Sequence, residues 1–473
     1  MNKNKELVVN TAIITVGKIC TQFISFLLLP FYTALLSTEQ YGTVDLFNTY
    51  VSLLLPITIF QIDQAFFRYM IDVRGDRESQ ETVVSTVFTF ALAQVAIFSF
   101  LFIIVQNFIS TSYKYYFYIN ILTCIFSSLT LQASRGLGDN ISYSLGSVIS
   151  GVTQIICNVL FIAVLHMGVE GMLLAALIGN TLCGFFILFK KRLFLLFKIS
   201  KFSIQDLKRY LKFSIPLIPN ALCWWIMGAV DRTIVFYFLG ISSTGLLSVS
   251  NKFSSIYITA LNIFLIPWYE SAALHIKDKD GNQFFRDVTS TVFRFFLAAN
   301  ICIIAVMQFV FRIMINAKFD GAYNQIPIYM IAALFNVIVG LYSVVYQAIK
   351  KTKEVAITSI GAAVINILVN LLLVKYIGLY AASISSLIAF LVMAIYRYMG
   401  VKKYINAPLE RKLVVSAIPV YSVVLIGYYS DKLILKIAAL AAAIIYAIFI
   451  NRNSCKSILI NITQMISRLK QGS

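Results

Sequence analysis

The feature that most restricts the fold of this chain is a succession of apolar segments, each long enough for a helix to cross a bilayer. About twenty apolar residues span the hydrocarbon core as a helix, and a helix satisfies its own backbone polar groups there. The composition agrees, since 59% of the residues are hydrophobic, 12% are charged and the mean hydropathy is +0.84. We therefore predict an all-α integral membrane protein with fourteen transmembrane helices, at residues 10–36, 43–66, 83–109, 114–134, 144–165, 169–189, 211–239, 244–268, 288–315, 324–349, 355–374, 379–397, 411–429 and 432–450.

The charged residues predict the orientation of these helices. The net charge is +19, and the basic residues gather in alternate connections, above all in residues 190–212 and from Arg397 to Lys412. Basic loops mark the cytoplasmic side of a membrane, so both termini are expected there. The excess of positive charge is explained by this rule and does not predict binding to nucleic acid.

The second half of the chain repeats the first. Leu35–Tyr50 aligns with Phe238–Phe253, which places Gly42 on Gly245 and Asn48 on Asn251. Farther along, Gly146 aligns with Gly361 and Gly168 with Gly378. Two parallel six-helix repeats are expected to enclose a central cavity. The predicted divisions are a first bundle at 1–189, a basic cytoplasmic linker at 190–210, a second bundle at 211–400, and two additional helices with a basic tail at 401–473.

The sequence contains little that could perform covalent chemistry. His166 and His275 are the only histidines and lie near opposite faces of the predicted bilayer. No nucleotide-binding or hydrolase motif is present, and the seven cysteines are scattered without a CxxC pair. We therefore expect no enzyme activity, no metal and no cofactor.

Ionisable residues inside the predicted spans are the candidate functional residues, because they are costly in hydrocarbon and usually serve a function. A cationic cavity that receives a phosphate-bearing ligand is predicted from Lys18, Gln22, Arg232, Asn251 and Lys252. Asp231 and Asp63 are assigned to ion coupling or to structural charge pairing, in the case of Asp63 with Arg68. The alternatives stay open: Lys18 and Lys252 snorkel to an interface, and Asp231 and Arg232 serve packing alone. Asp45, at a span end, is expected to be solvated.

Two stretches carry a resemblance to a known family. They read NTAIITVGKICTQFISFLLLPFYTALLSTEQYGTVDLF near the N-terminus and PLIPNALCWWIMGAVDRTIVFYFLGISSTGLLSVSNKF at the seventh span. With the fourteen-span plan, the chain resembles the polysaccharide branch of the multidrug/oligosaccharidyl-lipid/polysaccharide (MOP) exporter superfamily, and within it the O-antigen flippases.

The resemblance implies a transporter of the bacterial inner membrane. Its expected substrate is an undecaprenyl-pyrophosphate-linked oligosaccharide, an O-antigen or capsule repeat unit, moved to the outer leaflet by alternating access and coupled to Na⁺ or H⁺. Membrane lipid, a polysaccharide polymerase and assembly proteins are the implied partners. The alternatives are a flippase for a lipid-linked peptidoglycan precursor, a multidrug/cation antiporter of the same superfamily, and a membrane polysaccharide polymerase.

Overall fold

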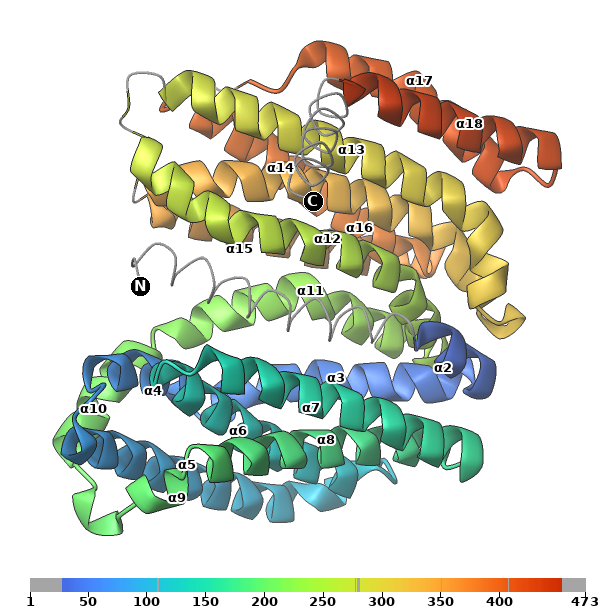
Figure 1. Cartoon of the computed structure of the whole chain (residues 1–473). Coiled ribbons are helices and arrows are strands. Elements are labelled where there is room, and N and C mark those ends of the chain that lie inside the picture. Colours follow the sequence, from blue (N-terminus) through green and yellow to red (C-terminus); the bar gives the residue numbers. More distant parts are fainter. Residues whose placement is uncertain are drawn as a thin grey trace, which may run out of the picture. The chain divides into compact units, whose positions relative to one another are not determined.

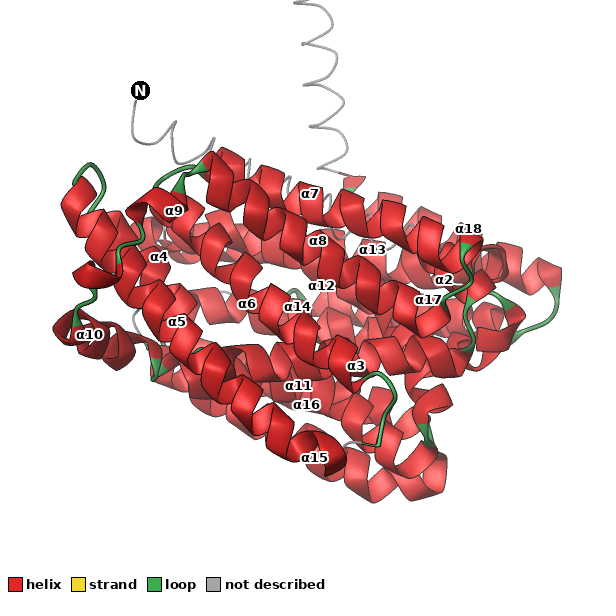
Figure 2. Ribbon diagram, turned by 90° about the horizontal axis from the view of Figure 1, so that it is seen from below, coloured by secondary structure: helices red, strands yellow, loops and turns green. Residues whose placement is uncertain are grey.

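The computed structural model describes residues 28–108, 110–276, 278, 281–349, 351–406 and 408–452. All regular secondary structure in these ranges is helical (Figures 1 and 2). The chain divides into two compact units, Met1–Ser248 and Val249–Ser473.

The first unit contains ten described α-helices and most of the short helical turns. The helices are α2 (Leu29–Leu35), α3 (Thr38–Thr58), α4 (Ile62–Asp72), α5 (Arg77–Val105), α6 (Lys114–Gly136), α7 (Asn140–Asn158), α8 (Gly168–Lys190), α9 (Leu193–Leu196), α10 (Ile204–Ser214) and α11 (Leu217–Leu239). Three turns, η1 (Gln106–Phe108), η2 (Val159–Val164) and η3 (Ile199–Lys201), complete it.

The second unit begins within α12. Its helices are α12 (Ile241–His275), α13 (Gly281–Met314), α14 (Ile326–Ala348), α15 (Thr352–Ile377), α16 (Tyr380–Val401), α17 (Arg411–Tyr429) and α18 (Leu433–Ile450), with the turn η4 (Ala317–Gln325) before α14. The hairpin of α17 and α18 packs against α13 (Figure 1).

The expectation of an all-α membrane protein is confirmed. Ten helices in the described ranges are long and apolar enough to cross a bilayer, and the bent pair α3 and α4 adds an eleventh candidate span. Helices α11 and α12 coincide with the predicted seventh and eighth spans, while most of the first predicted span, 10–36, lies outside the described residues.

The core of the first unit lies among α4, α5, α6 and α10, where Phe66, Val84, Ile125 and Tyr210 are buried together. By contrast, α5 leaves Leu92, Ile97, Phe100 and Ile103 more than half exposed. An exposed apolar face is stable on a helix whose solvent is lipid, because lipid tails are as apolar as these side chains.

The second predicted span is broken rather than straight. Helices α3 and α4 meet at 56°, and Phe60 and Gln61 between them have left-handed backbone angles, with φ of 51° and 54°. Pro56 near the end of α3 has no amide to donate and disturbs the helical ladder. The break places Asp63 in the first turn of α4.

The second unit corrects one prediction about charge. Arg397, expected in the basic cytoplasmic flank, is instead a fully buried residue of α16. Its guanidinium donates to Thr358, Ser359 and the carbonyl of Val355 on α15, and to Ser343 and the carbonyl of Val339 on α14. The five N–H donors of an arginine thus join three helices.

Candidate functional site

The structure distributes the predicted site residues over several elements. Asp231 and Arg232 lie on α11 and Asp63 on α4, all in the first unit. Asn251 and Lys252 lie on α12 in the second unit. Lys18 and Gln22 lie outside the described residues.

Arg232 forms an ion pair that the sequence did not predict. Its Nε lies 2.5 Å from Oδ2 of Asp45 on α3, with 18% and 21% of the two side chains exposed. A second guanidinium nitrogen donates to the carbonyl oxygen of Gly228, at 2.6 Å. The expectation that Asp45 is simply solvated was wrong, because its carboxylate accepts a charge-assisted hydrogen bond from Arg232.

A second contact holds the same two helices in register. The indole Nε1 of Trp225 on α11 donates to the carbonyl oxygen of Thr49 on α3, at 2.8 Å. Thr49 lies one turn beyond Asp45, and Trp225 lies two turns before Arg232. We call the contact made by Asp45, Thr49, Trp225 and Arg232 the α3–α11 seam.

The aligned glycines of the repeat meet beside this seam. A methyl group built on Gly42 would overlap the carbonyl oxygen of Ile241, and one built on Gly245 would overlap that of Thr38. The two overlaps are reciprocal, since Thr38 aligns with Ile241 as Gly42 does with Gly245. The first turns of α3 and α12 therefore cross at backbone distance, as small residues permit in membranes.

Within the described residues, Asp63 accepts hydrogen bonds from neutral donors alone. It is 8% exposed and accepts from Ser128 at 3.0 Å and from Gln64 at 3.1 Å. The predicted pairing with Arg68 was wrong, because Arg68 instead pairs with Asp72 at 2.6 Å. A buried carboxylate at a helix break is costly unless it takes up a cation or a proton.

The other predicted residues that the structure describes, Asp231, Asn251 and Lys252, are partly or fully covered by the protein. Asp231 is 8% exposed. The side-chain oxygen of Asn251 accepts from Ser254 at 2.6 Å, within its own helix. Lys252, next to it on α12, is half-buried.

The second unit has an apolar groove that sequence reasoning missed. A cavity of about 310 Å³ lies between α13, α14 and α17. Its lining is almost wholly apolar and comprises Phe293, Leu297, Ile331, Leu334, Phe335, Ile338, Val414, Ala417, Ile418, Tyr421, Ser422 and Leu425. Apolar residues are the rule in such helices, so no local pattern separates a groove from a packed or lipid-facing surface.

Solved structures of membrane transporters share this fold. The lipid II flippase MurJ, in an inward closed conformation, matches with a TM-score of 0.70 and 16% identity over 96% of this chain and 100% of that chain. An inward-facing multidrug resistance MATE family transporter of the MOP superfamily matches with a TM-score of 0.68 and 14% identity, over 81% of this chain and 95% of that one. The chain therefore has the all-α fold of the MOP transporters.

The family follows from the sequence. Residues 7–269 match the model of the family described as "Polysaccharide biosynthesis protein", and the chain belongs to that family. Lsg locus putative protein 1 of Haemophilus influenzae is 27% identical over 272 residues, 56% of this chain and 66% of the relative. An uncharacterized membrane protein of the same organism is 24% identical over 295 residues, 60% of this chain and 69% of the relative.

The chain thus spans about two thirds of the length of both curated relatives. The predicted resemblance is confirmed in two respects: the chain belongs to the polysaccharide biosynthesis protein family, and its fold is that of the MOP transporters.

Proposed function

We propose that this multi-pass membrane protein is a flippase for an undecaprenyl-pyrophosphate-linked oligosaccharide, an O-antigen or capsule repeat unit. The observation that carries the proposal is the apolar groove of the second unit, in a chain of the polysaccharide biosynthesis protein family. Translocation from the inner to the outer leaflet changes no covalent bond, in keeping with a transporter fold.

The groove suits the lipid part of such a substrate. A polyprenyl chain offers only apolar surface. Its free energy in an apolar groove is therefore similar to its free energy among lipid tails, and it can enter the groove at little cost. The groove extends along α17 from Val414 to Leu425, eleven residues apart, or about 16 Å of helix. A chain lying there stays anchored while the polar part of the substrate moves.

The pyrophosphate and glycan are assigned to the cationic residues predicted from the sequence, Lys18, Arg232 and Lys252, with Gln22 and Asn251 as neutral donors. In this proposal the pyrophosphate competes with Asp45 for Arg232. Substrate binding would then weaken the α3–α11 seam, because the single positive charge of Arg232 would be shared between two anions.

The transport cycle proposed here is alternating access between bundles at 1–189 and 211–400, linked by 190–210, with 401–473 as an appendage. The reciprocal contact of Gly42 and Gly245, at aligned positions of the two halves, supports the proposed repeats. Asp63, with Asp231 as the second candidate, is proposed to bind the coupling Na⁺ or H⁺. The bacterial inner membrane, cytoplasmic termini, and partnership with a polymerase and assembly proteins belong to the same proposal.

The test is transport by the full chain in proteoliposomes. A fluorescently labelled undecaprenyl-pyrophosphate oligosaccharide is placed in the vesicles, and its exposure to a membrane-impermeant quencher is followed with and without Na⁺ or proton gradients. We expect gradient-dependent movement of this lipid. Equal or faster movement of labelled lipid II would instead identify a peptidoglycan precursor flippase, and ethidium transport without lipid movement would identify a multidrug antiporter.

A matched pair of variants tests the groove in the same assay. Ile418 and Ile426 both lie on α17 and are both 61% exposed, but only Ile418 lines the groove. Ile418→Trp should slow lipid movement about tenfold, as expected for a loss of roughly 1.4 kcal/mol, whereas Ile426→Trp should not. Equal rates in the two variants would remove the groove from the mechanism.

A further inference from the structure

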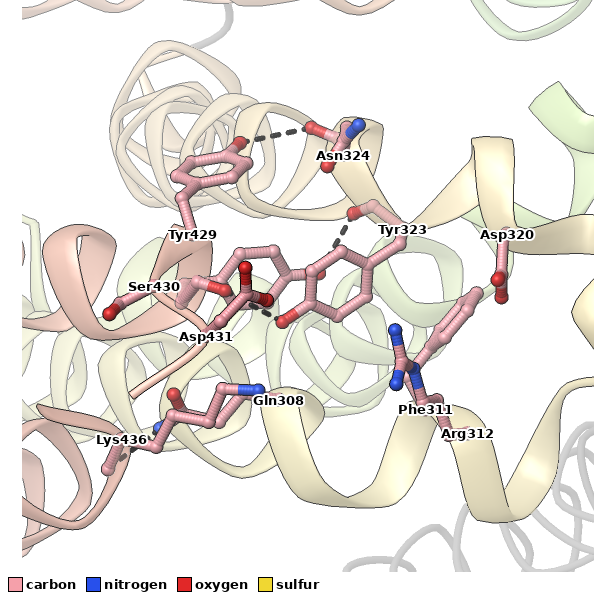
Figure 3. Close-up of a pocket in the computed structure, with 11 residues that line it drawn as sticks. Gln308, Phe311, Arg312, Asp320, Tyr323, Asn324, Tyr429, Ser430, Asp431 and Lys436 are labelled. Atoms are coloured by element: carbon pink, nitrogen blue, oxygen red, sulfur yellow. Dashed lines mark hydrogen bonds between the residues drawn. The ribbon is translucent and has the colours of Figure 1, made fainter. Parts of the chain in front are cut away.

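A second cavity in the second unit has the opposite character to the groove. It measures about 220 Å³ and lies where α13, η4 and the turn between α17 and α18 come together (Figure 3). Its lining is mainly polar and aromatic, and we call it the tyrosine pocket. The residues are Gln308, Phe311, Arg312, Asp320, Tyr323, Asn324, Tyr428, Tyr429, Ser430, Asp431 and Lys436.

Two tyrosines form a rigid wall of this pocket. The rings of Tyr323 and Tyr428 are stacked, with centroids 4.1 Å apart and an interplanar angle of 10°. The Tyr428 hydroxyl donates to the Tyr323 carbonyl at 2.8 Å, and the Tyr323 hydroxyl donates to the Tyr428 carbonyl at 2.9 Å. Tyr429 likewise donates to the carbonyl of Asn324 at 3.0 Å. These bonds fix the shape of the wall before any ligand arrives.

Four charged side chains surround the wall without pairing. Arg312 and Lys436 are balanced by Asp320 and Asp431, and within the described part of the chain none of the four makes an ion pair. In Figure 3, Arg312 and Asp320 lie on one side of Tyr323, and Asp431 and Ser430 on the other. The pocket is therefore neutral overall but rich in strong donors and acceptors.

A buried amide supplies an unused acceptor. Gln308 is 7% exposed, and its Nε2 donates to the carbonyls of Ala305 and Lys436, at 2.8 and 3.0 Å. Its Oε1 is buried and accepts no hydrogen bond from the described residues. Buried acceptors are normally satisfied, so an unpaired one in the lining of a cavity points to a donor brought by a ligand or water.

We propose that the tyrosine pocket binds one neutral saccharide unit. A sugar ring offers hydroxyls that both donate and accept, which matches a neutral set of carboxylates, cations and amides. Its C–H faces suit the electron-rich faces of aromatic rings. A phosphate would require a net positive lining, and an organic cation a net negative one.

The position of the pocket connects it with the proposed substrate. On α17 the groove ends at Leu425 and the pocket begins at Tyr428, roughly 4.5 Å farther along the helix. A lipid-linked oligosaccharide can thus lie with its chain in the groove and a sugar in the pocket, at the outer end of α17 in the predicted orientation. This assignment of the sugar to the transported lipid rests on the proposed function.

The experiment measures binding to the full chain in nanodiscs by saturation-transfer NMR. The probes are the methyl glycosides of glucose, galactose and N-acetylglucosamine, with inorganic pyrophosphate and tetraphenylphosphonium as anionic and cationic alternatives. We expect at least one glycoside to bind, and Asp320→Asn with Asp431→Asn to weaken it about tenfold or more, because hydrogen bonds to charged groups are lost. Asp287→Asn, an exposed change at the other end of α13, should leave the affinity unchanged.

Several results would overturn the proposal. One is that no glycoside binds at concentrations up to tens of millimolar, and another is that the pocket variants bind the glycoside as tightly as the Asp287→Asn control. A third is that only pyrophosphate or tetraphenylphosphonium binds, and that Arg312→Gln or Asp431→Asn changes this binding. Transport assays on the same variants separate the two proposals. Glycoside binding without lipid movement would refute the flippase function and support saccharide binding in the tyrosine pocket. Lipid movement without glycoside binding would support the flippase function and refute saccharide binding in the pocket.

Discussion

Asp45 on α3 and Arg232 on α11 form an ion pair across 187 residues of sequence, with Oδ2 and Nε 2.5 Å apart. Arg232, which the sequence predicts as a substrate-binding cation, is thus already paired with a carboxylate. In the proposed transport cycle, a substrate phosphate would compete with that carboxylate for Arg232. Under that proposal, the α3–α11 seam is the place where substrate binding and helix movement are coupled.

The first prediction concerns this pair. Arg232→Gln should destabilise the protein by about 2 kcal/mol, because it leaves the partly buried carboxylate of Asp45 without its cation. The charge swap Asp45→Arg with Arg232→Asp should recover most of that stability, measured by thermal unfolding in detergent. If Arg232 also binds pyrophosphate, the swap should restore stability but not lipid movement.

The exposed pair Arg68 and Asp72, half of each side chain in solvent, provides the control. Arg68→Gln should cost no more than about 0.5 kcal/mol. Recovery of both stability and transport by the charge swap would show that Arg232 has a structural role alone.

Much of the fold could be predicted from the sequence, because the length of an apolar helix that crosses a bilayer is set by the thickness of the hydrocarbon core. The repeat stays a prediction, and one backbone feature agrees with it: the aligned Gly168 and Gly378 both adopt positive φ, 55° and 57°, a conformation that glycine adopts at little cost. Side-chain partners were not predictable in the same way. Asp45 was expected to be solvated and Arg397 to belong to a basic cytoplasmic flank, because both lie near span ends, yet Asp45 pairs with Arg232 and Arg397 is enclosed by three helices.

The site was predictable only in part, for a physical reason. Intramembrane charge marks residues that need partners, and so it identified Asp63 and Arg232 without identifying those partners. The apolar groove and the tyrosine pocket arise from helices distant in sequence, and their residues are ordinary ones for a membrane protein.

The glycine crossing gives the second prediction. Gly42→Ala and Gly245→Ala should each destabilise the protein and reduce transport, because a methyl group at either site meets a backbone carbonyl that cannot rotate away. Gly361→Ala is the matched control, since a methyl group there has no heavy atom within 4 Å. Thermal unfolding and lipid movement report the two effects. Wild-type behaviour of both Gly42→Ala and Gly245→Ala would mean that this close approach is dispensable.

The third prediction concerns pH. Asp139, the N-cap of α7, forms an ion pair with Lys191 and accepts from the amide of Ser142 at 2.9 Å. Partial burial raises the pKa of Asp139, but the hydrogen bonds from Lys191 and Ser142 outweigh it and lower the pKa to about 2. An unfolded chain has a pKa of about 3.9 at this residue. The carboxylate therefore stabilises the fold above about pH 4, and this contribution disappears as the pH falls toward 2.

Asp139→Asn isolates that contribution, because asparagine also caps helices well. The variant should be less stable than the wild type at pH 7 by about 1 kcal/mol or less, as for a solvent-screened pair. The difference should shrink between pH 4 and pH 2 in thermal unfolding. A difference that stays constant with pH would assign the effect to the cap rather than to the charge.

The fourth prediction concerns Asp63 at the break between α3 and α4. Asp63→Asn keeps an acceptor for Ser128, 3.0 Å away, and removes a buried charge, so the fold should survive with its melting temperature little changed. If Asp63 carries the coupling ion, the response of lipid movement to a Na⁺ or proton gradient should fall at least tenfold, about 1.4 kcal/mol, while gradient-independent equilibration continues. Ser128→Ala should keep the gradient response and shift its ion dependence, because the carboxylate loses one donor. Full gradient response in Asp63→Asn would make the residue structural, and the coupling role would then pass to Asp231 on α11.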